Sequence, residues 1–488
     1  MWKTLEKSAA LVKHIIVASV VGLSAQLDVY YMAIGLIGLL VFSWARLFDV
    51  MAIPKLVEYH QNQNKAAFKS LAGGLFNFSL IFSILLAALI LEFSHPIAML
   101  PFGFEPERKN MLSAAFFWLA PAMIFYIPLF QLGTAFRAVR RFSIFYRAEF
   151  LIGAITLFFI IIYPKQPRIL LWSFSAGVFG AFCFLSIYAR KFIRFSASPF
   201  SRDIRSIFRN APGLMSLQLS HYLFILTDRW FVSFLPKGNV GALAYGRMIS
   251  WLVVGMTNMK GSFLTIFAEL GATSDRKNNV YNDLFSLSIF VALPTSVFLI
   301  MFGKDFVSVL LERGVFTQED TILVYQSIVG FSWSILPTII LGPMEQIFQA
   351  QGQLNLIVWR KALGIVTNIM FSYLFLFVLD GGILGVAAAS SVGYWIIMLS
   401  GIGAARKLGL SLLARRLIVW FFYVLGGALL AGVLIKFLDA WIDRPHFLLA
   451  KPFIFAFVFI AIAFFYKGNE GLMVKKTLLR LMPGKQTT

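Results

Sequence analysis

The chain has 488 residues, of which 59% are hydrophobic, 16% are aromatic and only 13% are charged. Soluble domains carry about 25% charged residues, so this composition excludes an ordinary water-soluble protein and indicates a lipid bilayer as the solvent. The single cysteine, Cys183, excludes an internal disulfide and a cysteine-rich metal site, and the five histidines show no ligand spacing. We therefore expect no metal site. The net charge of +21 would indicate nucleic-acid binding in a soluble protein, so the location of the charges decides its meaning.

Hydrophobic stretches of about 20 residues, the length that crosses the hydrocarbon core, recur along the whole chain. They predict an all-α polytopic membrane protein with about fourteen transmembrane helices. The connections between these stretches are too short to hold a soluble domain. The predicted stretches are 8–25, 28–53, 70–92, 111–135, 143–163, 169–189, 207–235, 239–268, 283–303, 321–349, 356–379, 382–404, 414–436 and 447–466.

Lysine and arginine are distributed unevenly between the two sides of this arrangement. One side, which includes RAVRRFSIFYR (137–147), RKFIRFSASPFSRDIR (190–205) and both termini, holds roughly three times as many as the other. The positive-inside rule places that side in the cytoplasm, so we expect a multi-pass protein of the bacterial inner membrane with both termini cytoplasmic. The basic charge is then a topology signal and an attraction to anionic lipid head groups, and we expect no nucleic-acid partner. A cleaved signal peptide is an alternative interpretation of the first stretch, although Lys13 interrupts its apolar core.

The two halves of the chain resemble each other weakly. FSWARLFDVMAIPKL (42–56) aligns with GMTNMKGSFLTIFAEL (255–270), and this alignment pairs Arg46 with Lys260. An even number of helices in each repeat gives both copies the same orientation and places a substrate site between the halves. We predict a six-helix lobe over 1–195 and a second one over 196–408. Residues 409–488 then hold two additional transmembrane helices and a basic cytoplasmic tail.

Ionisable residues inside a membrane usually face a bundle interior or a watery cavity because their burial in lipid costs several kcal/mol. Basic residues outnumber acidic ones in the predicted helices, and most of the acids lie near helix ends. We therefore predict a cationic, water-filled cavity between the halves that binds an anionic ligand. Arginine and lysine side chains are well suited to bind phosphate. The basic residues that we consider for this cavity are Lys13, Arg46, Arg229, Arg247 and Lys260, and the acids considered in or near the helices are Asp28, Asp49, Glu149, Asp228 and Glu345.

Several of these cations also have an interpretation without function. Lys13 could extend to the cytoplasmic surface, and Arg229 could anchor its helix at the membrane interface. Arg46 could pair with Asp49, which lies one turn later on the same helix. The other two cations lie on one predicted helix with no acid between them, and for these we favour the shared cavity.

Three segments carry a resemblance to a known family. They are LVKHIIVASVVGLSAQLDVYYMA (11–33), DRWFVSFLPKGNVGALAYGRM (228–248) and LERGVFTQEDT (311–321). In their order and spacing they resemble bacterial lipid II flippases of the MurJ (MviN) type, within the multidrug/oligosaccharidyl-lipid/polysaccharide exporter superfamily. The likeness covers nearly the whole chain and depends on no single motif.

The resemblance implies roles for individual residues. Lys13 and Arg247 take the places of cavity arginines, and Asp28 matches an aspartate at the cavity mouth. His14 and Arg46 depart from the family because they stand at or near positions of acidic residues. This cavity would therefore be more cationic than usual, which favours a phosphorylated lipid and leaves lipid II and other polysaccharide precursors as alternatives.

Some members of the family resemble sodium-binding proteins. Asp228 and Asn368 match the acid and the asparagine of such a site, but Ser372 stands where a second acid would be. We therefore consider Asp228 and Asn368 as an ion site. Sodium or the membrane potential is the expected driving force, and no other cofactor is expected.

The function expected from these observations is a flippase that moves a polyprenyl-diphosphate-linked sugar across the inner membrane by alternating access. Lys13, Arg46, Arg247 and Lys260 would bind the diphosphate, and the last two predicted helices would form a groove for the lipid tail, as the resemblance implies. No catalytic triad, P-loop or metal motif is visible in the sequence, so we expect a transporter, working as a monomer, and not an enzyme. A multidrug or cation antiporter of the same superfamily is the main alternative, and a membrane-bound transferase is a third.

Overall fold

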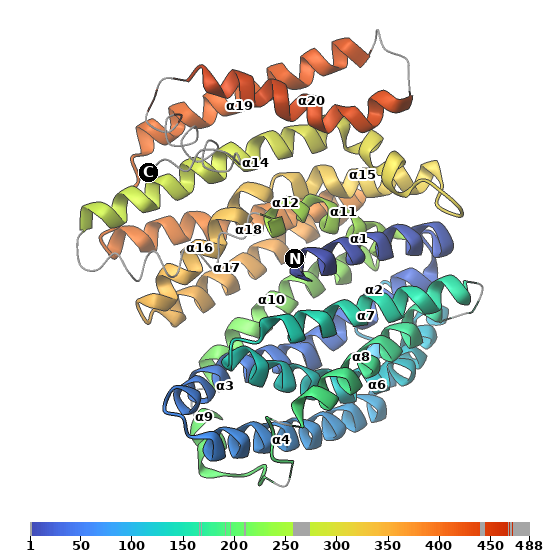
Figure 1. Cartoon of the computed structure of the whole chain (residues 1–488). Helices are drawn as coiled ribbons and strands as arrows, with labels where there is room; N and C mark the ends of the chain where they lie inside the picture. Colours follow the sequence, from blue (N-terminus) through green and yellow to red (C-terminus); the bar gives the residue numbers. More distant parts are fainter. Residues whose placement is uncertain are drawn as a thin grey trace. The chain divides into compact units, whose positions relative to one another are not determined.

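The computed structural model describes residues 2–164, 166, 168–190, 192–195, 197–208, 211–256, 274–439, 445–466, 468 and 471. Long helices dominate these residues, which contain no strand (Figure 1). In this part of the chain, nine helices are long and apolar enough to cross a membrane, and the bent pair Gln318–Ser332 with Ile335–Gln349 makes up to ten. The prediction of an all-α polytopic membrane protein is confirmed.

Each of the fourteen stretches predicted from hydropathy contains at least one helix. Helices suit a bilayer because they satisfy every backbone hydrogen bond within the segment, which lipid cannot do. The second predicted stretch, 28–53, lies within a longer helical run, Ala25–Gln61. This run is interrupted by a π-helical turn, η1 (Gly38–Phe42).

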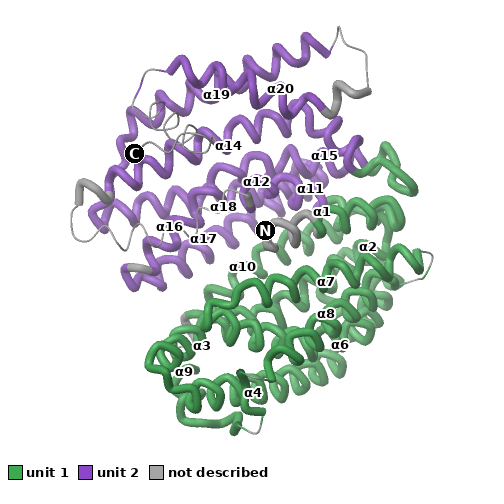
Figure 2. The backbone as a smooth tube through the Cα atoms, viewed as in Figure 1, with its two compact units in different colours: residues 1–242, 311–320 green, residues 243–310, 321–488 purple. Residues whose placement is uncertain are grey.

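The chain divides into two compact units (Figure 2). Unit 1 comprises residues 1–242 and 311–320, and unit 2 comprises 243–310 and 321–488. These units group helices by backbone proximity, whereas the lobes predicted over 1–195 and 196–408 rest on the internal repeat. The lobes stay a prediction.

In unit 1, α6 lies against α3, α4 and α8, while α7 packs on α1 and α8. Aromatic rings fill part of this core, and Phe48 of α3 contacts the rings of Phe78, Phe82 and Phe208. The elements are α1 (Trp2–Val21), α2 (Ala25–Ile37), η1, α3 (Ser43–Gln61), α4 (Lys65–Glu92), α5 (Ser94–Ala98), α6 (Pro106–Ala138), α7 (Phe142–Ile162), α8 (Ile169–Ala189), α9 (Arg202–Phe208) and α10 (Ala211–Val232).

In unit 2, α17 and α18 pair closely, α16 packs on both, and α19 pairs with α20. Trp420 of α19 is fully buried, and its Nε1 donates to the Ser286 carbonyl of α14 at 2.9 Å. The elements are α11 (Asn239–Ser250, which starts in unit 1), α12 (Leu252–Met256), α14 (Ser274–Leu311), α15 (Gln318–Ser332), α16 (Ile335–Ala350), α17 (Leu354–Tyr373), η2 (Leu374–Val378), α18 (Gly382–Lys407), α19 (Ala414–Asp439) and α20 (Pro445–Phe464).

The segment 311–321, one of those that carry the family resemblance, has a structural explanation. The Val315 amide donates to the Ser19 carbonyl of α1 at 3.0 Å. Gly314 has a φ of 64°, and a Cβ at this position would overlap the same carbonyl. Thr317 and Asp320 then exchange hydrogen bonds between side chain and backbone, at 3.0 and 3.3 Å, which is a capping box at the start of α15.

Prolines lie inside several long helices. A bend of 51° separates α15 from α16 at a break of two residues. Pro337 lies in the first turn of α16, where its missing amide hydrogen leaves no hydrogen bond unmade. Pro54, Pro121, Pro128 and Pro294 lie within helices that remain continuous.

Candidate functional site

Arg46, on α3, is an exposed cation inside the long apolar run of unit 1. Its guanidinium carbon lies 5.5 Å from the centre of the Phe130 ring, on α6. Asp49 does not pair with it, because Arg137 binds Asp49 through two hydrogen bonds of 2.5 and 2.8 Å. The alternative interpretation that Arg46 pairs with Asp49 is therefore wrong. Among the described residues Arg46 forms no ion pair, and its charge stays available.

Two tyrosines lie close enough to Arg46 for its charge to act on both: Tyr126 of α6 and Tyr222 of α10. Tyr126 stacks on Phe42 at a centroid distance of 4.0 Å. The Tyr222 ring packs where a Cβ on Gly38 would stand, at the start of the π-helical turn. Such turns within α-helices occur frequently at functional sites. The surroundings of Arg46 are thus aromatic and polar, which suits a hydrated head group.

Arg247 is a half-buried cation of unit 2, near the end of α11. Its guanidinium lies 4.7 Å from the centre of the Phe331 ring and 5.4 Å from that of Trp251. The Trp251 Nε1 donates to the Ser334 hydroxyl at 3.2 Å, which orients the indole. A guanidinium against ring faces keeps its charge and its planar set of donors.

Lys13 lies half-buried on α1 in unit 1, next to His14. The His14 Nδ1 lies 3.2 Å from the Tyr31 hydroxyl of α2. His14, one of the two residues that depart from the family pattern, therefore contacts α2 from α1. Lys260 lies outside the described residues, as does most of the repeat segment 255–270. Lys13 and Arg46 belong to unit 1 and Arg247 to unit 2, and their convergence on one cavity stays a prediction.

Asp28 connects α2 to the start of α11. Its carboxylate accepts the backbone amides of Gly238 and Gly241 at 2.6 and 2.8 Å, and the Arg108 guanidinium lies 3.6 Å away. A carboxylate at this place satisfies free amides and interacts favourably with the helix dipole. The side chain has no exposed surface, so a role at a cavity mouth would require α11 to move.

Arg229 of α10 is held inside unit 1. Its guanidinium donates to the Tyr31 carbonyl and lies 5.7 Å from the centre of the Tyr31 ring. Gly35 of α2 leaves the space that this side chain occupies. The neighbouring Trp230 donates to the Leu100 carbonyl at 2.7 Å. Arg229 therefore fastens α10 to α2, and its anchoring of the helix at the membrane interface stays a prediction.

The two residues considered for an ion site are both fully buried. Asp228 lies on α10 in unit 1, and Asn368 lies on α17 in unit 2, where it accepts a hydrogen bond of 3.1 Å from Ser372. Within the described residues, no group of three histidine, cysteine, aspartate or glutamate side chains could hold a metal ion. The pairing of Asp228 with Asn368 stays a prediction.

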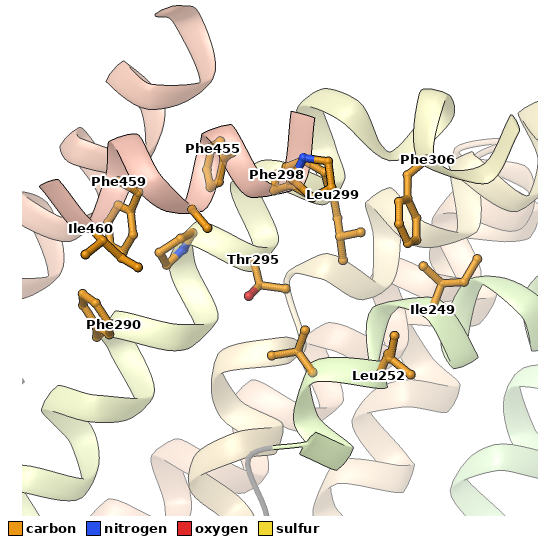
Figure 3. Close-up of a pocket in the computed structure, with 14 residues that line it drawn as sticks. Ile249, Leu252, Phe290, Thr295, Phe298, Leu299, Phe306, Phe455, Phe459 and Ile460 are labelled. Carbon is orange, nitrogen blue, oxygen red and sulfur yellow. The ribbon is translucent and has the colours of Figure 1, made fainter. Parts of the chain in front are cut away.

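An apolar pocket of about 370 Å³ lies in unit 2 between α11 and α12, α14, and α20 (Figure 3). Phenylalanines line much of it, including Phe298 of α14 and Phe455 of α20. The hydroxyl of Thr295, its polar lining group, donates to the Val291 carbonyl within α14 at 2.7 Å. The pocket therefore offers apolar surface and suits a hydrocarbon chain. The predicted groove involved the last two helices, but α20 lines this pocket without α19.

A buried lysine fastens α20 beside this pocket. The Lys451 ammonium lies 2.6 Å from Asp305 of α14 and 2.8 Å from Asp439 of α19, and its side chain is 2% exposed. It also lies 5.6 Å from the centre of the Phe302 ring. Sequence reasoning missed this group and the Arg137–Asp49 pair, because the partners are 12 to 146 residues apart. The sequence does carry a signal for Lys451, because this lysine lies inside the last apolar stretch, 447–466.

The family model described as lipid II flippase MurJ matches residues 17–457. A probable lipid II flippase MurJ from Buchnera aphidicola subsp. Acyrthosiphon pisum is 22% identical over 408 residues, which cover 79% of this chain and 78% of that protein. One from Rhizobium tropici is 23% identical over 270 residues, covering 51% and 49%.

Solved structures share the fold. A lipid II flippase MurJ in an inward closed conformation superposes with a TM-score of 0.81 at 16% identity, covering 98% of this chain and 99% of that one. An inward-facing multidrug resistance MATE family transporter of the MOP superfamily gives 0.72 at 13% identity, covering 83% and 94%. Since the family model spans most of the sequence, from the middle of α1 to α20, this chain belongs to the MurJ family of lipid II flippases.

Proposed function

We propose that this protein is a flippase that moves a polyprenyl-diphosphate-linked sugar precursor across the bacterial inner membrane by alternating access. Lipid II and a related cell-envelope polysaccharide precursor are the candidate substrates. The supporting observation is Arg46, an exposed guanidinium in a membrane helix that forms no ion pair among the described residues. Such a charge is costly in lipid, and ionisable residues in membrane helices usually face the bundle interior or a water-filled cavity. A cation in such a cavity can bind the anionic head group.

The head group of the substrate sets the physical problem. Sugars and phosphates cannot cross lipid unaided, because each unpaired polar group costs several kcal/mol to bury. Arg46 and Arg247, with Lys13 and Lys260, would bind the diphosphate with charge-assisted hydrogen bonds. The tyrosines near Arg46 would contact the sugars. An inside-negative potential favours outward movement of the anion by about 2.3 kcal/mol per charge per 100 mV.

The lipid tail needs apolar surface throughout the transfer. The pocket between α14 and α20 supplies it, since its lining is almost entirely hydrocarbon. In this proposal the cations bind the head group, while the tail lies in this pocket or in lipid. No covalent step is needed, so the protein acts as a transporter.

Coupling, topology and assembly complete the proposal. Asp228 and Asn368 would bind sodium if the two units bring them together, and exchanging sodium for potassium would then slow transport. Both termini would lie in the cytoplasm, and the protein would work as a monomer. Labelling of introduced terminal cysteines in intact cells and in lysed cells tests the topology.

Transport into vesicles tests the function. The purified full-length protein is reconstituted into liposomes, and movement of a fluorescent lipid-linked sugar diphosphate is followed with a membrane-impermeant quencher. We expect Arg46→Gln to lower the rate at least tenfold, which corresponds to about 1.4 kcal/mol. Arg415→Gln removes another exposed arginine, at the start of α19, and should leave the rate within about twofold.

Two further arms separate the alternatives. Ala456→Trp fills the apolar pocket and should slow substrates with long tails more than short-chain analogues. A cationic dye serves as the substrate of a multidrug antiporter. Dye movement without lipid movement would overturn the flippase proposal, and so would equal rates for Arg46→Gln and the unmodified protein.

A further inference from the structure

A second pocket, of about 590 Å³, lies in unit 1 and is independent of the apolar pocket. It is formed by the end of α3, the start of α4, the connection between α6 and α7, and the segment after α8. By the predicted topology all four parts are cytoplasmic. None of the residues discussed above as diphosphate ligands lines this pocket.

The lining is strongly basic. Lys65, Lys69 and Arg141 contribute three exposed cations, and His60 adds an imidazole. No residue in the described lining is acidic. Within the structurally described part of the chain, the three cations form no ion pair.

The nearby carboxylates are already engaged. Glu58 forms two hydrogen bonds of 3.1 Å with Lys55. Asp203 accepts a hydrogen bond of 2.8 Å from the hydroxyl of Tyr59, which itself lines the pocket. No carboxylate therefore lines the pocket, and among the described residues none forms an ion pair with its three cations.

The backbone holds these cations together. Lys65 and Lys69 are four residues apart in the first turns of α4 and share one face, where like charges repel. Asn64 caps this helix by accepting the Ala67 amide at 3.0 Å. The helix has 28 residues, so its N-terminus adds a partial positive charge. A bound anion would offset this repulsion.

Aromatic side chains give the pocket an apolar wall. The Arg141 guanidinium lies 5.0 Å from the centre of the Phe192 ring. Phe68, which lies between the two lysines in the sequence of α4, is 5% exposed and also lines the pocket. The Arg194 amide donates to the Lys69 carbonyl at 3.1 Å, which ties the segment after α8 to α4. The arrangement offers a cluster of positive charges beside a hydrophobic wall.

We propose that this pocket binds a phosphate-bearing anion at the cytoplasmic face, separately from the transported substrate. Three converging cations at a helix N-terminus are suited to a phosphate monoester or diester. Phe68, Phe192 and Val139 would contact the part of the ligand that carries no charge. An anionic phospholipid head group and a soluble phosphate share this chemistry, and the experiment separates them.

The experiment measures binding and needs no transport. The full-length protein is purified in neutral detergent. Phosphatidylglycerol and phosphatidylcholine are titrated by native mass spectrometry, and inorganic pyrophosphate is titrated by calorimetry. The variant Lys65→Gln/Lys69→Gln/Arg141→Gln removes the cations of the pocket. The control Lys407→Gln/Arg415→Gln/Arg416→Gln removes three exposed cations of unit 2 and has the same net charge.

We expect the pocket variant to weaken binding roughly 100-fold, about fivefold for each cation, and the control to change it less than twofold. Selective phosphatidylglycerol binding would identify a lipid head group, and saturable pyrophosphate binding would identify a soluble phosphate. Either result supports the proposal. Equal losses in both triple variants, or no saturable binding of either probe, would overturn it. If the triple variant does not elute as a folded protein, the single variant Arg141→Gln with its fivefold loss decides.

Because transport is not measured, this inference and the flippase proposal can fail independently. A protein that flips lipid-linked sugars without binding either probe would keep the proposed function and lose the pocket. A protein that binds phosphatidylglycerol through Lys65, Lys69 and Arg141 but moves no lipid would do the reverse.

Discussion

The ion pair between Arg137 of α6 and Asp49 of α3 provides a test of what stabilises unit 1. The guanidinium binds the carboxylate at 2.5 and 2.8 Å, and Thr134 donates to the same carboxylate at 2.7 Å. The two charged side chains are only 15% and 8% exposed. Removing one partner of a buried pair leaves an uncompensated charge and costs about 3–5 kcal/mol.

The perturbation is Arg137→Met, which keeps an unbranched apolar side chain in the same space. For a unit of this size, about 2 °C of melting temperature is lost for each kcal/mol. We therefore expect a fall of roughly 6–10 °C in a thermal unfolding scan of the purified protein in detergent. The double variant Arg137→Met/Asp49→Leu should recover at least half of that loss, because a hydrophobic replacement of a buried pair is often neutral.

Helix α3, which carries Asp49, also offers a matched control. Lys55 and Glu58 form an ion pair of 3.1 Å, but their side chains are 33% and 52% exposed. A pair at the surface contributes about 0–1 kcal/mol, so Lys55→Met should lower the melting temperature by less than about 2 °C. The reasoning would be refuted if Arg137→Met and Lys55→Met had equal effects, or if the double variant Arg137→Met/Asp49→Leu recovered none of the stability that Arg137→Met loses.

Two further predictions concern backbone strain and buried charge. Gly314→Ala should lower the melting temperature more than Gly352→Ala in the same scan. Both glycines have positive φ, but of these two only Gly314 faces a backbone carbonyl that a Cβ would overlap. Equal effects of the two substitutions would contradict this account. Asp305→Asn/Asp439→Asn should destabilise the protein more than Lys451→Met, because the lysine is 2% exposed and the carboxylates are 40% and 38% exposed. The carboxylates can regain water when their partner is lost, whereas the ammonium cannot, and the opposite order of melting temperatures would show that the lysine finds another partner.

Hydropathy alone located the helices, because a segment that crosses lipid must satisfy its own backbone and cover it with apolar side chains. Both requirements are local in the chain, so each predicted stretch contains a helix. The same analysis identified Arg46 as an unusual cation, since its cost depends on depth in the membrane and not on its neighbours. The family resemblance singled out 311–321, although it did not explain the capping box or the contact with α1.

Partner choice was decided by the tertiary structure. Asp49 lies three residues from Arg46 but binds Arg137, which is 88 residues away. Asp28 caps a helix more than 200 residues later, and the basic pocket joins residues from four separate parts of unit 1. Distance along the chain does not limit an ion pair or a cap; the packing of helices does. The amino-acid sequence by itself therefore determined a helical membrane protein with positive charges inside its apolar stretches, and the fold determined the partners of the charged side chains, such as Arg137 for Asp49.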